Sequence, residues 1–133
     1  MRILIVDDDF LSRKLLAREL RKLGPCAQAC GGEEGLQAYK SALAEGAPYD
    51  LILLDIVMPG MDGGELLRMI RAEENSRGAT GDRRCAIAMA TTQADKDTVV
   101  RSFRDEADGY IIKPYTPGSV LRYLRRHDLI SPA

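Results

Sequence analysis

Short apolar runs alternate five times along the chain with segments in which apolar residues recur every three or four positions. The runs predict strands, and the recurring residues predict amphipathic helices. We expect strands at residues 3–6, 26–30, 51–54, 86–90 and 110–112, and helices at 11–23, at about 33–43, and around 66–70, 99–103 and 117–124. A strand–helix alternation repeated five times predicts an α/β fold, a doubly wound five-stranded parallel sheet with right-handed crossovers.

Turn and capping residues mark several of the expected helix ends. Gly24-Pro25 should stop the first helix, and Thr116-Pro117 should supply the last helix with an N-cap and a first-turn proline. Asp9 and Asp62 each precede a helix and are expected to cap it. Residues 75–84 are polar and contain glycine, so we expect a loop there that is long for a compact domain.

Polar side chains stand at the ends of four of the expected strands. The third run is four aliphatic residues that end at Asp55, which is typical of a strand buried on both faces. The other ends supply Asp7, Asp8 and Asp9 after the first strand, Thr91 and Thr92 after the fourth, and Lys113-Pro114 after the fifth. Ligands meet parallel sheets at the carboxyl ends of their strands.

These residue types together indicate phosphate chemistry. Carboxylates gathered at one edge repel one another unless a cation compensates, and the natural compensators are a hard divalent ion and the Lys113 ammonium. A hydroxyl and an ammonium nearby suit the remaining oxygens of a phosphoryl group. The set predicts transfer of a phosphoryl group to a carboxylate, with a metal ion to neutralise its charge.

The composition limits the classes of protein to be considered. With 133 residues, 45% hydrophobic and 29% charged, the chain is expected to be one globular domain. Its net charge of −1 gives no reason to expect direct contact with nucleic acid or an anionic membrane. No apolar run approaches the roughly 20 residues of a membrane span, and the N-terminus lacks a signal-peptide cleavage site, so we expect a cytoplasmic protein. Cys26, Cys30 and Cys85 are expected to be reduced and mostly buried.

Four short motifs, in this order and spacing, resemble those of a receiver domain of bacterial two-component response regulators, the CheY-like family. They are Val6-Asp7-Asp8, Leu54-Asp55 with residues 58–63, Met89-Ala90-Thr91, and residues 109–114. The resemblance covers residues 3 to about 126. It implies a flavodoxin-like three-layer sandwich with strand order 2-1-3-4-5, a receiver domain over residues 1–128, and a short tail over 129–133 with no effector domain.

Carried over residue by residue, the resemblance implies a role for each strand-end group. Asp55 would accept a phosphoryl group from the phosphohistidine of a histidine kinase. The implied ligands of Mg²⁺, or of Mn²⁺ in its place, are Asp55, Asp8, the backbone carbonyl of Val57 and, largely through water, Asp7. The other implied roles are phosphoryl-oxygen binding by Thr91 and Lys113, a rotamer change at Tyr110, a cis peptide at Lys113-Pro114, and tuning of phosphoryl loss by Val57 and Gln93.

The resemblance also implies how the protein signals. Phosphorylation would bias a two-state surface made of the fourth helix, the fifth strand and the fifth helix. The expected partners are a histidine kinase or histidine phosphotransfer protein and a target protein that the sequence does not identify. The chain is expected to be a monomer or weak dimer that catalyses only its own phosphorylation and dephosphorylation.

Two positions depart from the pattern of the family. Val57 offers no polar group to orient an attacking water, so our hypothesis is a longer-lived phosphorylated form than a polar residue there would give. Glu106 stands where many members have a helix-ending glycine. It must end the fourth helix in another way or adopt a left-handed conformation.

Two other classes of protein fit part of the pattern. In a haloacid-dehalogenase-like phosphohydrolase, Asp7 would be the nucleophile and Asp9 the acid. Such enzymes usually have Thr or Val where this chain has Leu11, and Asp55→Asn would leave their nucleophile intact. A receiver-like adaptor would work without phosphate, although every expected site residue is present here.

Taken singly, several polar residues also have structural explanations. Asp9 is explained as a helix cap, Thr92 as a turn hydroxyl, and His127 as a cation at a helix end. The basic residues of the first and last helices are expected to form solvated faces; these are Arg13, Lys14, Arg18, Arg21, Lys22, Arg122, Arg125 and Arg126.

Overall fold

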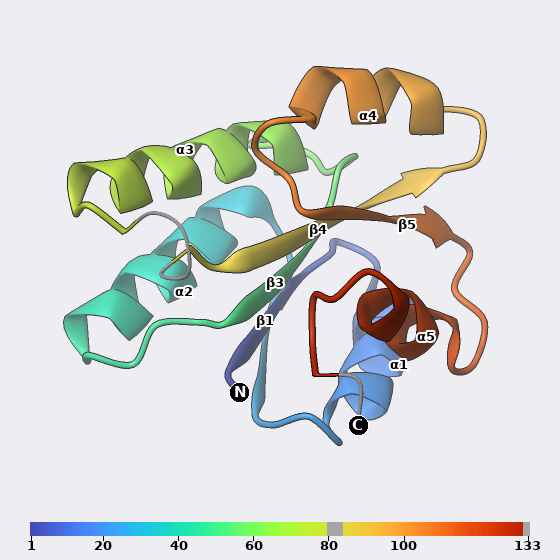
Figure 1. Cartoon of the computed structure of the whole chain (residues 1–133), viewed down its shortest axis with the longest axis horizontal. Helices are drawn as coiled ribbons and strands as arrows, with labels where there is room; N and C mark the ends of the chain where they lie inside the picture. Colours follow the sequence, from blue (N-terminus) through green and yellow to red (C-terminus); the bar gives the residue numbers. More distant parts are fainter. Residues whose placement is uncertain (80–83, 132–133) are drawn as a thin grey trace.

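Five parallel strands form one sheet with helices on both faces, which confirms the predicted fold (Figure 1). The computed structural model describes residues 1–79 and 84–131. The strand order is β2-β1-β3-β4-β5, as the resemblance implied. The strands are β1 Ile3–Val6, β2 Cys26–Ala29, β3 Leu51–Asp55, β4 Ala86–Thr92 and β5 Gly109–Lys113.

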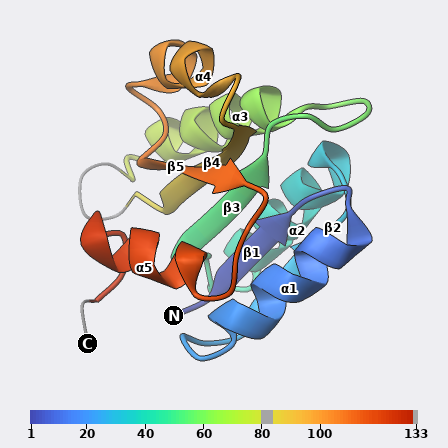
Figure 2. The ribbon, with the colours of Figure 1, turned by 90° about the vertical axis from the view of Figure 1, so that its right-hand side faces the viewer.

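The helices divide between the two faces of the sheet. They are α1 Phe10–Leu20, α2 Gly32–Ala44, α3 Gly63–Ser76, α4 Lys96–Phe103 and α5 Ser119–Arg126. Figure 2 shows α1 and α5 on one side of the sheet, and α2, α3 and α4 on the other. Among the described residues no helix is both long and apolar enough to cross a membrane.

Each face of the sheet has its own hydrophobic core, because successive residues of a strand point to opposite faces. In β3, Leu51 and Leu53 pack with α1 and α5, where Leu20 and Leu124 are fully buried. The alternate residues of the same strand pack with α2 and α3. Burial on both faces explains why this strand is a continuous apolar run.

The end of α1 differs from the prediction. The helix ends at Leu20 and not at residue 23, because the chain tightens after it into turns in which Leu23 N–H donates to Leu20 O and Gly24 N–H donates to Arg21 O. Such three-residue hydrogen bonds are common where the last carbonyls of a helix lack partners. Gly24 therefore follows a turn, and does not directly cap the helix.

The predicted N-cap of α5 is wrong. Gly118, with a φ of +79°, is the N-cap, and the helix begins at Ser119. The Ser119 hydroxyl donates to the carbonyl of Thr116 and accepts from its N–H, at 2.8 and 3.1 Å. These bonds close a separate turn, so Pro117 lies in that turn and not in the first turn of the helix.

Smaller differences concern loops and cysteines. α3 continues to Ser76, so the loop predicted at 75–84 begins two residues later; its residues 80–83 lie outside the described part of the chain. All three cysteines are free, and Cys85 is buried and Cys26 half-buried. Cys30 is exposed, contrary to expectation, because β2 ends before it and its thiol contacts Glu34 in the following turn.

Candidate functional site

The register of the strands brings the polar strand ends together. The residue before Asp7 pairs with the residue before Asp55, and Asp55 pairs with the residue before Thr91. In the next strand, Lys113 pairs with the residue after Thr91. These four side chains therefore start from one edge of the sheet, which confirms the predicted gathering.

Three carboxylates meet at this edge. One oxygen from each of Asp7, Asp8 and Asp55 lies within 4.8 Å of the others. Asp7 is 1% exposed and Asp55 is 5% exposed, whereas Asp8 faces solvent. The Nζ of Lys113 lies 3.0 Å from Asp55 Oδ2 and 3.4 Å from Asp7 Oδ2. One ammonium thus pairs with two of the three carboxylates.

The pKa values of the paired groups reflect this imbalance. Burial raises the pKa of Asp55 to about 6; the charge of Asp7 adds to the rise, and the hydrogen bond and charge of Lys113 oppose it. Burial lowers the pKa of Lys113. The contact with Asp55 and the negative charges of Asp55 and Asp7 have a larger, opposite effect, so the pKa of Lys113 is raised overall. At neutral pH the cluster therefore carries an excess of negative charge.

The carboxylate group fits a hard divalent cation. Asp7 Oδ2 is buried, and no described residue donates a hydrogen bond to it. The three side chains offer only oxygen ligands, which Mg²⁺ prefers, and a doubly charged ion would compensate their charge. Asp7, Asp8 and Asp55 are thus a suitable ligand set, as the sequence predicted.

A pocket of about 390 Å³ opens beside the carboxylates. Asp55, Thr91 and Lys113 line it, and the buried Thr91 hydroxyl makes a long hydrogen bond of 3.4 Å to the carbonyl of Thr92. Val57 also lines the pocket and is 74% exposed. The Lys113–Pro114 peptide bond is cis, as expected.

Two other predicted site residues lie apart from the carboxylates. Gln93 is exposed after the end of β4 and does not line the pocket, so its tuning role stays a prediction. Tyr110 packs against the core on the α2–α3 side, and burial raises its pKa. Its buried hydroxyl has no hydrogen-bond partner among the described residues, which costs about 1–3 kcal/mol. A different ring position that gives the hydroxyl a partner would recover this energy.

Asp9 turns away from the carboxylate group. Its Oδ2 accepts hydrogen bonds from the N–H and hydroxyl of Ser12, at 3.0 and 2.6 Å, which confirms it as the N-cap of α1. Asp62 caps α3 in the same way, and the Thr92 hydroxyl bonds to Asp95 in the turn after β4. A side chain committed to a cap is poorly placed to act as an acid, which argues against the hydrolase alternative.

Two residues next to the site were not predicted. Arg13 was expected on a solvated face, but it is half-buried and its Nη1 donates to the carbonyl of Asp7 at 2.8 Å. A Cβ at Gly63 would overlap the carbonyl of Asp55, so only glycine lets α3 begin this close to the end of β3. The signal for Gly63 was the glycine pair directly after the capping residue Asp62; Arg13 had no such signal.

The fold and this edge of the sheet define the chain as a receiver-type α/β domain. Residues 3–125 match the family described as the response regulator receiver domain, and the chain belongs to this family. Members of the family are signalling domains that bind Mg²⁺ at an acidic pocket and interact with histidine kinases and downstream targets.

Individual relatives agree with this assignment. Transcriptional regulatory protein ResD of Bacillus subtilis is 37% identical over 123 residues, which are 90% of this chain and 45% of ResD. Chemotaxis protein CheY of Pseudomonas aeruginosa is 33% identical, with 87% of this chain and 86% of CheY covered. The structure of chemotaxis response regulator CheY4 of Vibrio cholerae is similar with a TM-score of 0.75 at 28% identity, over 95% of this chain and 97% of CheY4.

The relatives differ in what they contain besides this domain. The chain spans about half the length of ResD and of the DNA-binding response regulator MtrA of Mycobacterium tuberculosis, but most of CheY. A chemotaxis protein and a DNA-binding response regulator are both among the relatives that match. The expected lack of direct nucleic-acid contact therefore stays a prediction.

Proposed function

We propose that the protein is a phosphoacceptor of two-component signalling and that Asp55 is the phosphorylated residue. The donor would be a phosphohistidine of a histidine kinase or of a histidine phosphotransfer protein. The observation that carries the proposal is the position of the Asp55 carboxylate, buried at the sheet edge beside Asp7, with the Lys113 ammonium 3.0 Å away. With a pKa of about 6 it is largely ionised at neutral pH and can act as a nucleophile.

The proposed transfer is a displacement at phosphorus. A carboxylate oxygen of Asp55 forms the new O–P bond while the N–P bond of the phosphohistidine breaks. The imidazole nitrogen keeps the electron pair of that bond. The ring takes any proton it needs from solvent, so the histidine is released as neutral imidazole. Lys113 places positive charge against the phosphoryl oxygens, and the Thr91 hydroxyl lines the same pocket as a donor. Bound Mg²⁺ would neutralise phosphoryl charge; its proposed ligands are Asp7, Asp8, Asp55 and the Val57 carbonyl.

The acyl phosphate would then change the neighbouring surface. It adds about −1.5 to −2 charges and draws Lys113 of β5 and the hydroxyl of Thr91 towards itself. Movement of Thr91 would make room for Tyr110, whose buried hydroxyl has no partner among the described residues. We propose that α4, β5 and α5 are biased between two states in this way, and that a target protein or the next member of a relay recognises the result.

The experiment is incubation with acetyl phosphate and Mg²⁺, followed by intact mass measurement. We expect a gain of about 80 Da, one phosphoryl group, that is absent from Asp55→Asn. Asp9→Asn is the matched control, because asparagine is also a good N-cap and the change leaves the three-carboxylate group intact. Labelling that survives in Asp55→Asn but is lost in Asp7→Asn would favour the hydrolase alternative and refute the proposal.

A further inference from the structure

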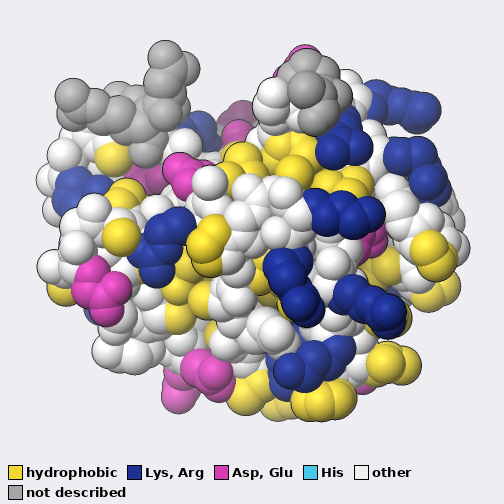
Figure 3. All heavy atoms as spheres, turned by 90° about the horizontal axis from the view of Figure 1, so that it is seen from below, with side chains coloured by type: hydrophobic (Ala, Val, Ile, Leu, Met, Phe, Trp, Pro, Cys, Tyr) yellow, Lys and Arg dark blue, Asp and Glu magenta, His cyan; other side chains and the backbone are white. Residues whose placement is uncertain are grey.

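Arg13 differs from the other basic residues of α1. Figure 3 shows a face of the molecule on which many Lys and Arg side chains stand out into solvent. Among the basic residues of α1 and the turn after it, Lys14, Arg18, Arg21 and Lys22 are exposed, whereas Arg13 is half-buried. Among the described residues, no carboxylate forms an ion pair with Arg13. Its positive charge is therefore held in the structure by other contacts.

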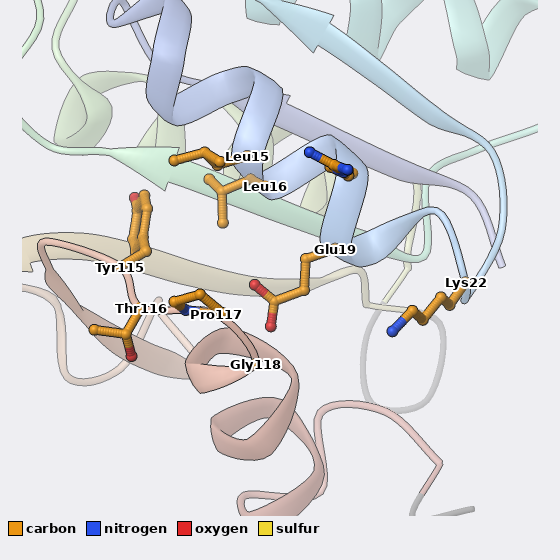
Figure 4. Close-up of a pocket in the computed structure, with 9 residues that line it drawn as sticks. Leu15, Leu16, Glu19, Lys22, Tyr115, Thr116, Pro117 and Gly118 are labelled. Carbon is orange, nitrogen blue, oxygen red and sulfur yellow. The ribbon is translucent and has the colours of Figure 1, made fainter.

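The guanidinium of Arg13 is directed at the loop between β1 and α1. Its Nη1 donates a hydrogen bond of 2.8 Å to the carbonyl of Asp7. Its central carbon lies 5.6 Å from the centre of the Phe10 ring, within the range of a cation–π interaction. The acidic residue of α1, Glu19, is committed elsewhere: Figure 4 shows it pointing towards the segment that leads into α5, where it accepts a hydrogen bond from the N–H of Leu121.

The carbonyl of Asp7 needs a donor from outside the sheet. The pairing of β1 with its two neighbours ends at Val6, which lies opposite Ala29 and Leu54. The N–H of Asp7 still donates to the carbonyl of Ala29 at 3.1 Å, but its own carbonyl lies beyond the paired residues. Because Arg13 supplies a donor there, both backbone polar groups of Asp7 have a partner.

Holding this carbonyl fixes the direction of the next side chain. The peptide group that joins Asp7 to Asp8 is planar, so the orientation of the Asp7 carbonyl sets the dihedral angles on both sides of it. The Asp7 carboxylate is held separately, by the N–H of Asp9 at 2.9 Å and by Lys113 Nζ at 3.4 Å. The Asp8 carboxylate is exposed and has no ion pair among the described residues. The contact of Arg13 with the backbone is therefore a main restraint on its direction.

We infer that Arg13 is a positioning residue of the divalent-cation site at the acidic edge. It does not bind the ion. It holds the peptide group between two of the three carboxylates, so that the ion meets ligands that are already arranged. Groups that orient metal ligands typically contribute about 10–100-fold to metal affinity. The inference rests on the proposed cation site and is independent of phosphorylation at Asp55.

The sign of the effect separates positioning from charge. A positive charge close to a cation site opposes binding of the ion, so the loss of a charge alone should tighten binding. The loss of the Arg13 contact should weaken it, because the peptide after Asp7 must then be ordered when the ion binds. Lys14 is the matched control. It is the next residue of α1, it is exposed, and its Nζ lies 5.3 Å from the centre of the same Phe10 ring, but Arg13 is the residue that donates to the Asp7 carbonyl.

The test titrates the metal-free protein with Mn²⁺ and measures the free ion by electron paramagnetic resonance. We expect Arg13→Met to raise the Kd about tenfold or more, and Lys14→Met to leave the Kd unchanged or to lower it. Arg13→Lys should stay within about threefold of wild type, because an ammonium group can still donate a single hydrogen bond to a carbonyl. Asp8→Asn, which removes a proposed ligand, should lose most of the binding.

Thermal unfolding of the same metal-free proteins identifies a merely structural role. If Arg13→Met lowered the metal-free midpoint but kept the wild-type Kd, Arg13 would only support the fold and the inference would be overturned. Tighter binding in Arg13→Met would also overturn it, since charge would then outweigh position. If Asp8→Asn bound Mn²⁺ as tightly as wild type, the proposed cation site would be wrong and the inference would fail with it. Failure of acetyl phosphate to label Asp55, with these Kd values as expected, would leave it intact.

Discussion

At the scale of single residues, the lifetime of the proposed phosphorylated form depends on Val57. The side chain is 74% exposed beside the pocket of Asp55 and has no polar atom to orient an attacking water. We expect Val57→Asn to shorten the half-life of the acyl phosphate several-fold, measured by the loss of phosphoryl mass after removal of the donor. Val57→Ile, which stays apolar, should keep the wild-type half-life. Equal half-lives in all three proteins would contradict the hypothesis.

Asp55 should lower the stability of the protein at neutral pH. Its pKa is 3.8 in the unfolded reference and about 6 in the folded protein, mainly through burial. Because the folded pKa is the higher one, the free energy of unfolding falls as the pH rises from about 4 to 6, and the full loss is present above 6. At about 1.4 kcal/mol per pKa unit the loss is up to about 3 kcal/mol.

Asp55→Asn removes the ionisable group and should therefore stabilise the metal-free protein at pH 7.5, by up to about 3 kcal/mol. The measurement is urea unfolding in the presence of a chelator, at pH 7.5 and again at pH 4. At pH 4 the wild-type carboxyl is protonated in the folded state, so the difference should shrink. A difference that is the same at both pH values would show that ionisation is not its cause.

The gathering of the site residues was predictable where the fold alone dictates proximity. Parallel strands in register must bring their carboxyl ends together, so Asp7, Asp55, Thr91 and Lys113 could be grouped without coordinates. The contact of Arg13 with the Asp7 carbonyl could not be predicted. It depends on how α1 sits against the sheet, and a basic residue in an amphipathic helix ordinarily points to solvent.

At the scale of elements, α5 is capped by a residue of another helix. Its own N-cap, Gly118, has no side chain, and the Glu19 carboxylate of α1 accepts from the N–H of Leu121 instead. A capping pattern considers only neighbouring residues and therefore points to Thr116, whereas Glu19 lies 102 positions from Leu121 in the sequence. This is a tertiary contact that no capping pattern reveals.

Glu19→Ala should lower the free energy of unfolding by about 1 kcal/mol, the usual cost of losing a helix cap. Glu19→Gln should cost less, since its amide oxygen can still accept the hydrogen bond but carries no charge for the helix dipole. Urea unfolding of the three proteins measures both effects. Equal losses in the two variants would mean that the cap contributes through charge alone, and no loss in either would contradict the assignment.

α4 ends without a left-handed conformation at Glu106. Among the described residues, Asp128 is the single non-glycine residue with a positive φ. Glu106 therefore has an ordinary backbone conformation. Its carbonyl accepts hydrogen bonds from Arg71 Nε and Arg84 Nη2, at 2.8 and 3.1 Å. Two guanidinium groups thus satisfy a backbone acceptor in the connection that a glycine cap would otherwise organise.

Arg71 also joins α3 to the start of β4 and of β5. It is 7% exposed and forms ion pairs with Glu74 and Asp108 at 2.7 and 2.8 Å. Arg71→Met should cost about 3–5 kcal/mol, because it leaves the buried Glu74 carboxylate without its counter-ion. Arg68→Met is the matched control: its ion pair with Glu106 is longer, at 3.7 Å, and joins an exposed arginine to a partly exposed glutamate, so it should be worth at most about 1 kcal/mol. If the two variants lost similar free energies of unfolding in urea, burial would not make the ion pairs of Arg71 more stabilising than the pair of Arg68.

At the scale of the whole molecule, sequence periodicity was sufficient for the topology and insufficient for the element ends. The two-residue period of the strands and the longer period of the helices determine which faces are buried, and hence the layers. The ends of α1 and α5 were wrong because a three-residue turn after Leu20 and a second turn at Thr116 interrupt patterns that look continuous.

The charge imbalance at the acidic edge predicts that Mg²⁺ stabilises the whole fold. An ion that binds the folded state and not the unfolded chain raises the free energy of unfolding by RT ln(1 + [Mg²⁺]/Kd), about 2.7 kcal/mol at a hundredfold excess over Kd. We expect the thermal midpoint to rise with Mg²⁺ and to return to its starting value with a chelator. The rise should be larger at pH 7.5 than at pH 5, because the pKa of Asp55 of about 6 leaves that carboxyl mostly neutral at the lower pH.

The variant Asp8→Asn tests whether this stabilisation comes from the acidic edge. Asp8 is exposed, and it belongs to the three-carboxylate group. Replacing it should leave the metal-free stability nearly unchanged and remove most of the Mg²⁺-dependent rise. Asp9→Asn should keep the rise, because Asp9 is the N-cap of α1 and not one of the three carboxylates. If Asp8→Asn were stabilised by Mg²⁺ as strongly as wild type, the ion would be acting elsewhere, and the three carboxylates would need another source of compensating charge.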